Sequence, residues 1–93
     1  MRVNIQKKYL FFREDARAIL KNIKRHKGVL KTVYLDFSQV HFMSRSFADE
    51  LLNMMKNLQN EGTKLEFQNL DPELKKMIGY IHKTKTAIQK AIA

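Results

Sequence analysis

The stretch Thr32-Val33-Tyr34-Leu35-Asp36-Phe37-Ser38-Gln39-Val40-His41-Phe42-Met43 carries the strongest fold signal in the chain. Its first half, Thr32–Phe37, is rich in β-branched and aromatic residues, which predicts a strand. Apolar side chains fall on both faces of that strand, as in an interior strand covered on both sides. Ser38-Gln39 ends the strand, and 40–43 is expected to be a short extended segment.

A helix is predicted directly after this segment, beginning with Ser46-Phe47-Ala48-Asp49. Ser46 is the expected N-cap, with Asp49 reaching back in the manner of a capping box. The buried stripe of this helix is apolar at helical spacing and comprises Phe47, Leu51, Met54, Met55 and Leu58. Gly62 is expected to end the helix.

The rest of the chain predicts a single α/β domain over residues 1–93. Residues 1–12 are expected to form a hairpin with a turn near Lys7, and 13–27 a helix that stops at Gly28. Residues 64–68 alternate as a strand does, and Asp71-Pro72-Glu73 starts a helix that Gly79 should close. A separate tail helix is expected at 80–93. We therefore expect a mixed sheet of about four strands with helices packed against it.

Composition excludes several classes of function. The 93 residues include no Cys, and no apolar run approaches membrane-spanning length. The start of the chain lacks the apolar segment of a signal peptide, so a soluble cytoplasmic protein is expected. Three isolated glycines cannot form a phosphate-binding loop, and His26, His41 and His82 lack metal-ligand spacing. Neither an enzyme nor a bound metal or cofactor is expected.

The net charge is +9, and the cations lie in two stretches that lack acids. These cations are Arg17, Lys21, Lys24, Arg25, Lys27 and Lys31 in the first stretch, and Lys75, Lys76, Lys83, Lys85 and Lys90 in the second. One interpretation is two solvated helix faces. The alternative is binding of nucleic acid without sequence specificity, which would be favoured if both stretches shared one face. Lysine outnumbers arginine, which does not favour base-specific recognition.

The best candidate site is Phe42-Met43-Ser44-Arg45-Ser46, which joins a strand region to the start of the central helix. Free amides at a helix N-terminus attract anions, so the segment suits a phosphoserine at Ser44 or Ser46, or an acidic group of a partner. The alternative is a simple helix cap beside exposed polar residues. Asp36, near the carboxyl end of its strand, either belongs to a functional site or has a structural role, in which it caps the next loop or pairs with a lysine or arginine of a helix.

The segment Val33–Met43 resembles the signature of STAS domains, in which a strand, an Asp, a short loop and Val-x-Phe follow one another. The resemblance covers residues 29–82. Arg13-Glu14-Asp15-Ala16-Arg17 and Ser46-Phe47-Ala48-Asp49-Glu50 are similar to elements of a group of small STAS-like domains of unknown function. The resemblance implies an α/β fold and a role in protein–protein switching.

In anti-sigma-factor antagonists of this family, the loop before the central helix carries a phosphorylated Ser or Thr, and the partners are histidine-kinase-like ATPases. The resemblance places Arg45 at that position, so either Ser44 or Ser46 substitutes, or Arg45 presents a permanent cation. We expect a non-enzymatic regulatory module whose partner surface comprises Ser44, Arg45, Ser46, Phe47, Asp49 and Asp36. A further alternative is a homodimer formed through 80–93.

Overall fold

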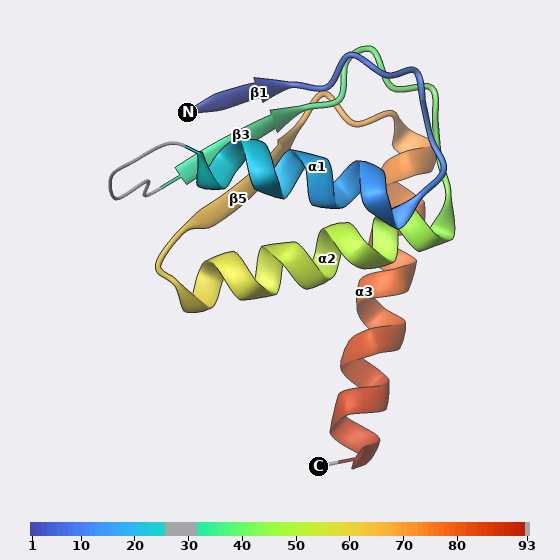
Figure 1. The fold of residues 1–93 in the computed structure, drawn as a ribbon. Coiled ribbons are helices and arrows are strands. Elements are labelled where there is room, and N and C mark those ends of the chain that lie inside the picture. The colour runs from blue at the N-terminus through green and yellow to red at the C-terminus, as the bar shows by residue number, and fades with distance from the viewer. Residues whose placement is uncertain (26–31, 93) are drawn as a thin grey trace.

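A computed structural model describes residues 1–25 and 32–92, without the side chains of 85–92. The elements, in chain order, are β1 (Arg2–Asn4), β2 (Tyr9–Leu10), α1 (Arg13–Lys24), β3 (Thr32–Asp36), β4 (Phe42–Met43), α2 (Arg45–Asn60), β5 (Lys64–Gln68) and α3 (Pro72–Ile92). Figure 1 shows α1 and α2 on the same side of the strands β1, β3 and β5. The predicted α/β class, with helices packed on a sheet, is confirmed.

The main sheet is parallel and has the order β1-β3-β5. Its register sets Val3 beside Leu35, and Leu35 beside Phe67. Because side chains alternate across a strand, these residues share the face that the helices cover. The opposite face carries polar rows such as Arg2, Tyr34 and Glu66. The prediction that β3 is covered on both faces is therefore wrong, since Tyr34 is only half-buried.

The predicted N-terminal hairpin over residues 1–12 does not form. β1 pairs with β3, and β2 pairs with β4 in a second, two-stranded parallel sheet. The segment between β1 and β2 has no Gly or Asn that favours a tight turn. Instead, the main chain of Ile5 still donates to Asp36, and the carbonyl of Lys8 accepts the N–H of His41. The structure thus has two small parallel sheets rather than one mixed sheet.

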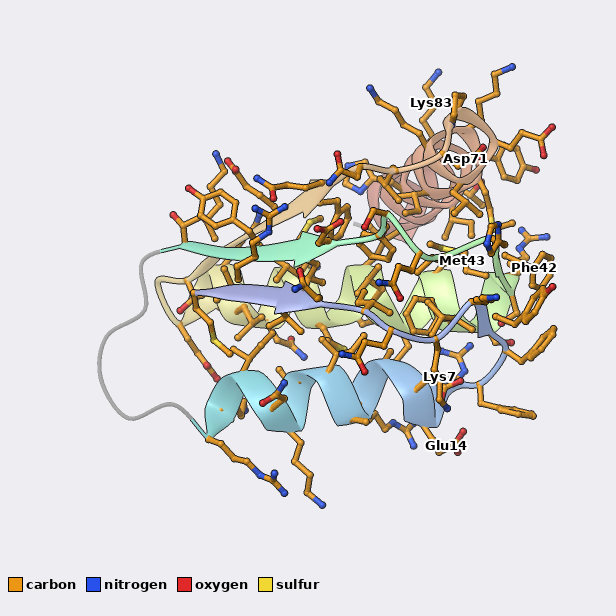
Figure 2. The ribbon with its side chains drawn as sticks, turned by 90° about the horizontal axis from the view of Figure 1, so that it is seen from above. Lys7, Glu14, Phe42, Met43, Asp71 and Lys83 are labelled. Carbon is orange, nitrogen blue, oxygen red and sulfur yellow. The ribbon has the colours of Figure 1, made fainter. Side chains whose placement is uncertain are left out.

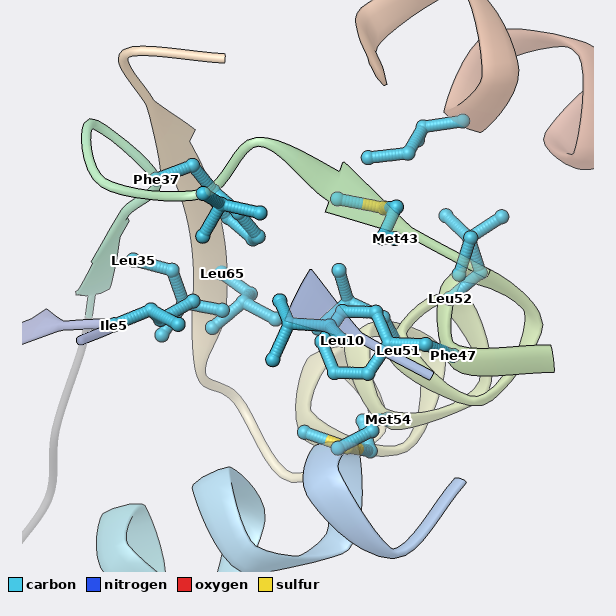
Figure 3. Packing of buried hydrophobic residues seen from close by; sticks show 14 of the residues in the cluster. Ile5, Leu10, Leu35, Phe37, Met43, Phe47, Leu51, Leu52, Met54 and Leu65 are labelled. Atoms are coloured by element: carbon cyan, nitrogen blue, oxygen red, sulfur yellow. The ribbon is translucent and has the colours of Figure 1, made fainter. Parts of the chain in front are cut away.

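The core is one apolar cluster drawn from the covered face of the sheet and from all three helices. Figure 3 shows Phe47, Leu51 and Met54 of α2 in this cluster together with Leu10 and Leu35. Full burial of each such side chain contributes about 1.5–3 kcal/mol to folding. The predicted apolar stripe of the central helix is confirmed, except that Met55 is only partly buried.

The helix ends follow the predicted punctuation at Asp71 and Gly62 and depart from it at Gly79. Asp71 accepts the N–H of Glu73 at 2.9 Å, and Gly62, with φ of 87°, follows the end of α2. Gly79, in contrast, does not end a helix, because α3 continues from Pro72 to Ile92 without a break. Helix α1 ends at Lys24, and the predicted stop at Gly28 lies outside the described residues.

Candidate partner-binding surface

Ser44 fixes the start of the central helix and replaces Ser46 as the N-cap. Its hydroxyl oxygen accepts the N–H of Phe47 at 3.0 Å. The Ser44 hydroxyl donates its hydrogen to the carbonyl oxygen of Phe11 at 2.6 Å. The main-chain N–H of Ser44 donates to the carbonyl oxygen of Leu10 at 2.7 Å. The pairing of β2 with β4 therefore places Ser44 at the cap and leaves Ser46 in the first helical turn.

Four large aromatic side chains lie exposed beside this cap, and we call Tyr9, Phe11, Phe12 and Phe42 the aromatic surface. They are between 40% and 64% exposed. The Phe11 ring lies 5.4 Å from that of Phe42 and 6.1 Å from that of Tyr9, measured between centroids. Figure 2 shows Phe42 at the outer end of the molecule, whereas Met43, its neighbour in β4, is buried. Exposed apolar clusters of this kind mark interaction sites.

Arg45 and Ser46 are exposed at the beginning of α2. The Arg45 guanidinium lies 5.8 Å from the ring centroid of Tyr80, within the range of a cation–π contact. Tyr80 belongs to α3 and is itself 63% exposed. The contact holds a cation and another aromatic ring at the surface near the helix start.

A cluster of ion pairs joins the first turns of α1 and α2. Arg13 donates to Asp49 at 2.8 Å and to Glu50 at 3.2 Å, and Arg17 lies 3.7 Å from the same Glu50. Because the Arg13 guanidinium donates to Asp49 and to Glu50, the bond to Asp49 having the larger effect, the pKa of Arg13 is raised above its ordinary value. This arrangement orients the start of α2 relative to α1, and Asp49 is half-buried within it.

Asp36 is buried at the end of β3, where it joins three segments. One oxygen accepts the Asn69 side-chain amide at 3.0 Å and the Ser38 N–H at 2.9 Å, and the other accepts Arg2 at 2.9 Å. These hydrogen bonds, that of Asn69 first, hold the pKa of Asp36 far below its usual range. Asn69 has a φ of 57°, a left-handed conformation that Asn tolerates better than most residues. The loop-capping alternative for Asp36 is confirmed by the Ser38 N–H, whereas the paired cation is Arg2 of β1 and not a lysine or arginine of a helix.

The structure brings Ser44, Arg45 and Ser46 together at one surface but separates the other predicted site residues from it. Phe47 is fully buried, so the expectation that it faces a partner is wrong. The candidate segment 42–46 includes Phe42 of the aromatic surface but not Tyr9, Phe11 and Phe12, because the hairpin expected over residues 1–12 assigns them to a strand. The signal was present: Tyr9-Leu10-Phe11-Phe12 is apolar at every position, more than one buried strand face can absorb.

The two basic stretches do not form one surface in the described residues. Helix α2 packs against both α1 and α3, and Figure 2 shows α1 near the β1 edge of the sheet and α3 near the β5 edge, with Lys83 directed away from α1. Arg17 and Lys24 of α1 have acidic neighbours in Glu50 and Glu61. Lys21 and Arg25 are exposed on α1, as are Lys75 and Lys76 on α3. Lys27 and Lys31 lie outside the described residues.

Comparison with known proteins supports the resemblance seen in the sequence. A family model described as STAS domain matches residues 5–87, which extends from just after β1 into α3. The comparisons with curated proteins and with solved structures found no match. STAS domains include anti-sigma-factor antagonists and are generally non-enzymatic regulatory modules. In the described part of the chain, no helix has the length and apolar character needed to cross a bilayer. The match spans most of the chain, which therefore belongs to the STAS domain family.

Proposed function

We propose that this chain is a non-enzymatic regulatory module that binds an acidic protein partner at the start of α2. The surface comprises the aromatic surface together with Arg45 and Ser46. The observation that carries the proposal is the exposure of Tyr9, Phe11, Phe12 and Phe42 directly beside the helix cap. Aromatic and arginine side chains dominate the binding energy of protein interfaces, which supports a docking role.

The charge of the chain supports an acidic partner. The formal net charge is +9, and Arg45 contributes an exposed cation at the surface itself. An acidic side chain of the partner near Arg45 would also lie near the free amides of the first turn of α2, which favour negative charge. We propose a histidine-kinase-like ATPase as the class of partner, in keeping with the anti-sigma-factor antagonists of the family.

Ser46 suits a phosphorylation switch better than Ser44. The Ser44 hydroxyl is held by Phe11 and Phe47, so a phosphate there would break the helix cap. The Ser46 side chain is exposed in the first helical turn, where a phosphate is favoured by the helix dipole. We therefore propose Ser46 as the modified residue of the two, next to the permanent cation of Arg45. Asp36 and Asp49 are left out of the surface because other residues of the chain bind their oxygens.

The experiment that tests the proposal compares proteins captured by four tagged forms of the full chain. They are the wild type, Arg45→Glu, Phe12→Ser and Lys56→Glu. Lys56 is exposed farther along α2, so Lys56→Glu makes the same charge change as Arg45→Glu at a distance from the surface. Quantitative mass spectrometry of the captured proteins, followed by titration of the purified partner, measures the differences.

A partner that binds the wild type and Lys56→Glu, but binds Arg45→Glu and Phe12→Ser at least about tenfold more weakly, supports the proposed surface. Equal weakening by Arg45→Glu and Lys56→Glu would assign the binding to overall charge and contradict the site. Binding unaffected by all three substitutions would place the partner elsewhere on the molecule.

A further inference from the structure

We propose that the free edge of β1 and the groove between β1 and α1 bind an extended segment of another protein, which adds a strand to the main sheet. The site is separate from the aromatic surface and does not rest on the function proposed above. It combines main-chain groups that need a strand with an apolar groove that takes the side chains of such a strand. Strand addition of this kind is a general mode of peptide recognition.

The main-chain hydrogen bonds of β1 identify its free edge. The carbonyl oxygen of Met1 accepts the N–H of Tyr34 at 2.9 Å, and the N–H of Ile5 is donated to the main-chain carbonyl oxygen of Asp36 at 3.1 Å. In a parallel ladder, alternate residues face the neighbouring strand, so Met1, Val3 and Ile5 are directed toward β3. The N–H and C=O groups of Arg2 and Asn4 are therefore directed outward. No described strand lies on that side of β1.

A groove follows this edge. It has a volume of about 280 Å³ and separates β1 and its continuation from one face of α1. Figure 2 shows β1 and α1 next to each other, with Lys7, one of the groove residues, near the start of α1. Most of the wall is apolar, contributed by Val3, Ile5, Leu10, Ala18 and Ile19. A strand added to β1 would direct every second side chain into this groove.

The chemistry of the edge defines the occupant. The outward groups of Arg2 and Asn4 repeat every second residue, which matches an extended backbone and not a helix or a nucleic acid. The apolar groove wall requires small apolar side chains at alternate positions of the bound segment. Arg25, one turn beyond the groove residue Asn22, is an exposed cation at one end, whereas Lys7 at the other end is paired with Asp15 of the groove wall at 2.8 Å. The segment is therefore apolar at alternate positions and acidic at the end that lies near Arg25.

A second copy of the chain fits this edge less well. Pairing of two β1 strands about a twofold axis would bring two α1 helices together, each with exposed Lys21, Lys24 and Arg25. Like charges at such an interface oppose association. An acidic segment from a different protein relieves the same charges, and so the proposal commits to that partner.

The probe is a fluorescent peptide about seven residues long, with alternating valine and threonine and an aspartate at each end. Two further peptides carry N-methyl groups either on the valines or on the threonines. Only one of these two sets of amides can face β1, so one methylated peptide should bind about tenfold more weakly than the other. Fluorescence anisotropy with the full chain gives the affinities. Hydrogen exchange of the Arg2 and Asn4 amides should slow when the unmodified peptide binds.

Three variants test the site on the protein. Ala18→Arg places a long side chain in the groove from an exposed position on α1, and Asn4→Pro removes an outward N–H without removing the bonds of Val3 and Ile5. Each should weaken binding about fivefold to tenfold. Gln59→Arg adds the same charge as Ala18→Arg on the exposed surface of α2 and should bind normally. Arg45→Glu should also bind normally, which separates this site from the aromatic surface.

Several results would overturn the proposal. Equal affinity of the two methylated peptides would exclude strand addition, and normal binding by both Ala18→Arg and Asn4→Pro would exclude this edge. Circular dichroism and thermal melting identify any variant that fails to fold. In that case the proposal is tested by the affinities of the two methylated peptides for the wild-type chain. Sedimentation equilibrium of the wild type provides the last test: a dimer that Asn4→Pro dissociates would show that a second copy is the occupant, contrary to the proposal.

Discussion

Ser44 donates its hydroxyl hydrogen to the carbonyl oxygen of Phe11 across 2.6 Å, while its oxygen accepts the N–H of Phe47. One side chain thus joins the aromatic surface to the start of α2. We expect Ser44→Ala to lower the free energy of unfolding by about 1 kcal/mol, the usual cost of losing an N-cap. Ser46→Ala is the matched control, because Ser46 is exposed in the same turn, and it should change stability by less than about 0.5 kcal/mol. Urea denaturation of both variants measures the difference, and equal effects would contradict Ser44 as the cap.

A pair of phenylalanine substitutions separates the core from the aromatic surface. Phe47 is fully buried, so Phe47→Ala should lower the free energy of unfolding by about 3–5 kcal/mol. Phe12 is 64% exposed, so Phe12→Ala should change it by less than about 0.5 kcal/mol. Chemical denaturation of both variants tests this. A large loss in Phe12→Ala would show that the aromatic surface belongs to the core and is not available to a partner.

The helix starts show what local sequence can and cannot predict. Asp71 was identifiable as an N-cap because Pro72 and Glu73 follow it, and all the cues lie within one turn. Near α2, two serines are equally good caps by local criteria. The choice of Ser44 depends on its N–H bond to Leu10, which is distant in sequence. A prediction from the residues near the helix had no access to that bond.

Alanine substitution of Gly79 in α3 and of Gly62 after α2 should change the free energy of unfolding in opposite directions. Gly79 lies inside α3, and a Cβ there would meet no atom within 4 Å. Gly79→Ala should therefore raise the free energy of unfolding by about 0.5–1 kcal/mol through helix propensity. Gly62 has a φ of 87°, a left-handed conformation that alanine adopts only at a cost. Gly62→Ala should therefore lower the free energy of unfolding by about 1–2 kcal/mol. Thermal melts of the two variants give the signs. A destabilised Gly79→Ala would indicate that α3 is interrupted at that residue.

Asp36 gives stability a defined dependence on pH. Its pKa in the folded state is far below the ordinary value because Asn69, Ser38 and Arg2 donate to it. A lowered carboxyl pKa adds stability above the unfolded-state value of about 4, and this stability is lost as the pH falls further. Asp36→Asn should therefore be less stable than the wild type at pH 7, and the difference should narrow below about pH 4. Urea midpoints across this range test the expectation. A second carboxyl group, that of Asp15, also has a lowered pKa, because Lys7 donates a hydrogen bond to it. Asp15 is present in both the wild type and Asp36→Asn, so its contribution to the pH dependence cancels when the two proteins are compared. A difference that stays constant with pH would exclude a charged role for Asp36.

Strand assignment could be predicted from the sequence, whereas strand pairing could not. The alternation in Lys64–Gln68 and the apolar residues of Thr32–Asp36 predicted β3 and β5 correctly. Residues 1–12 were expected to pair with each other because they are neighbours in sequence. In the structure, β1 and β2 each find a partner beyond α1, which local residues do not specify. Because the expected hairpin assigned residues 9–12 to a strand, the sequence predicted the 42–46 part of the candidate site but not the exposed side chains of Tyr9, Phe11 and Phe12.

The parallel arrangement also sets how the chain must fold. Val3 pairs with Leu35, Tyr9 with Phe42 and Val33 with Leu65, so each strand pairing joins residues about thirty positions apart. None of the described strands can pair with its nearest neighbour in sequence and so act as a rapid local nucleus. Each pairing must close a long loop, with a loss of chain entropy, before the hydrogen bonds between the two strands can stabilise it. The helices α1 and α2 lie within these loops, so their early formation or docking would bring the paired strands closer together and speed the pairing. We therefore expect folding on a slower timescale than that of a helical bundle of equal length, with mutations in α1 and α2 slowing the refolding rate more than mutations in α3.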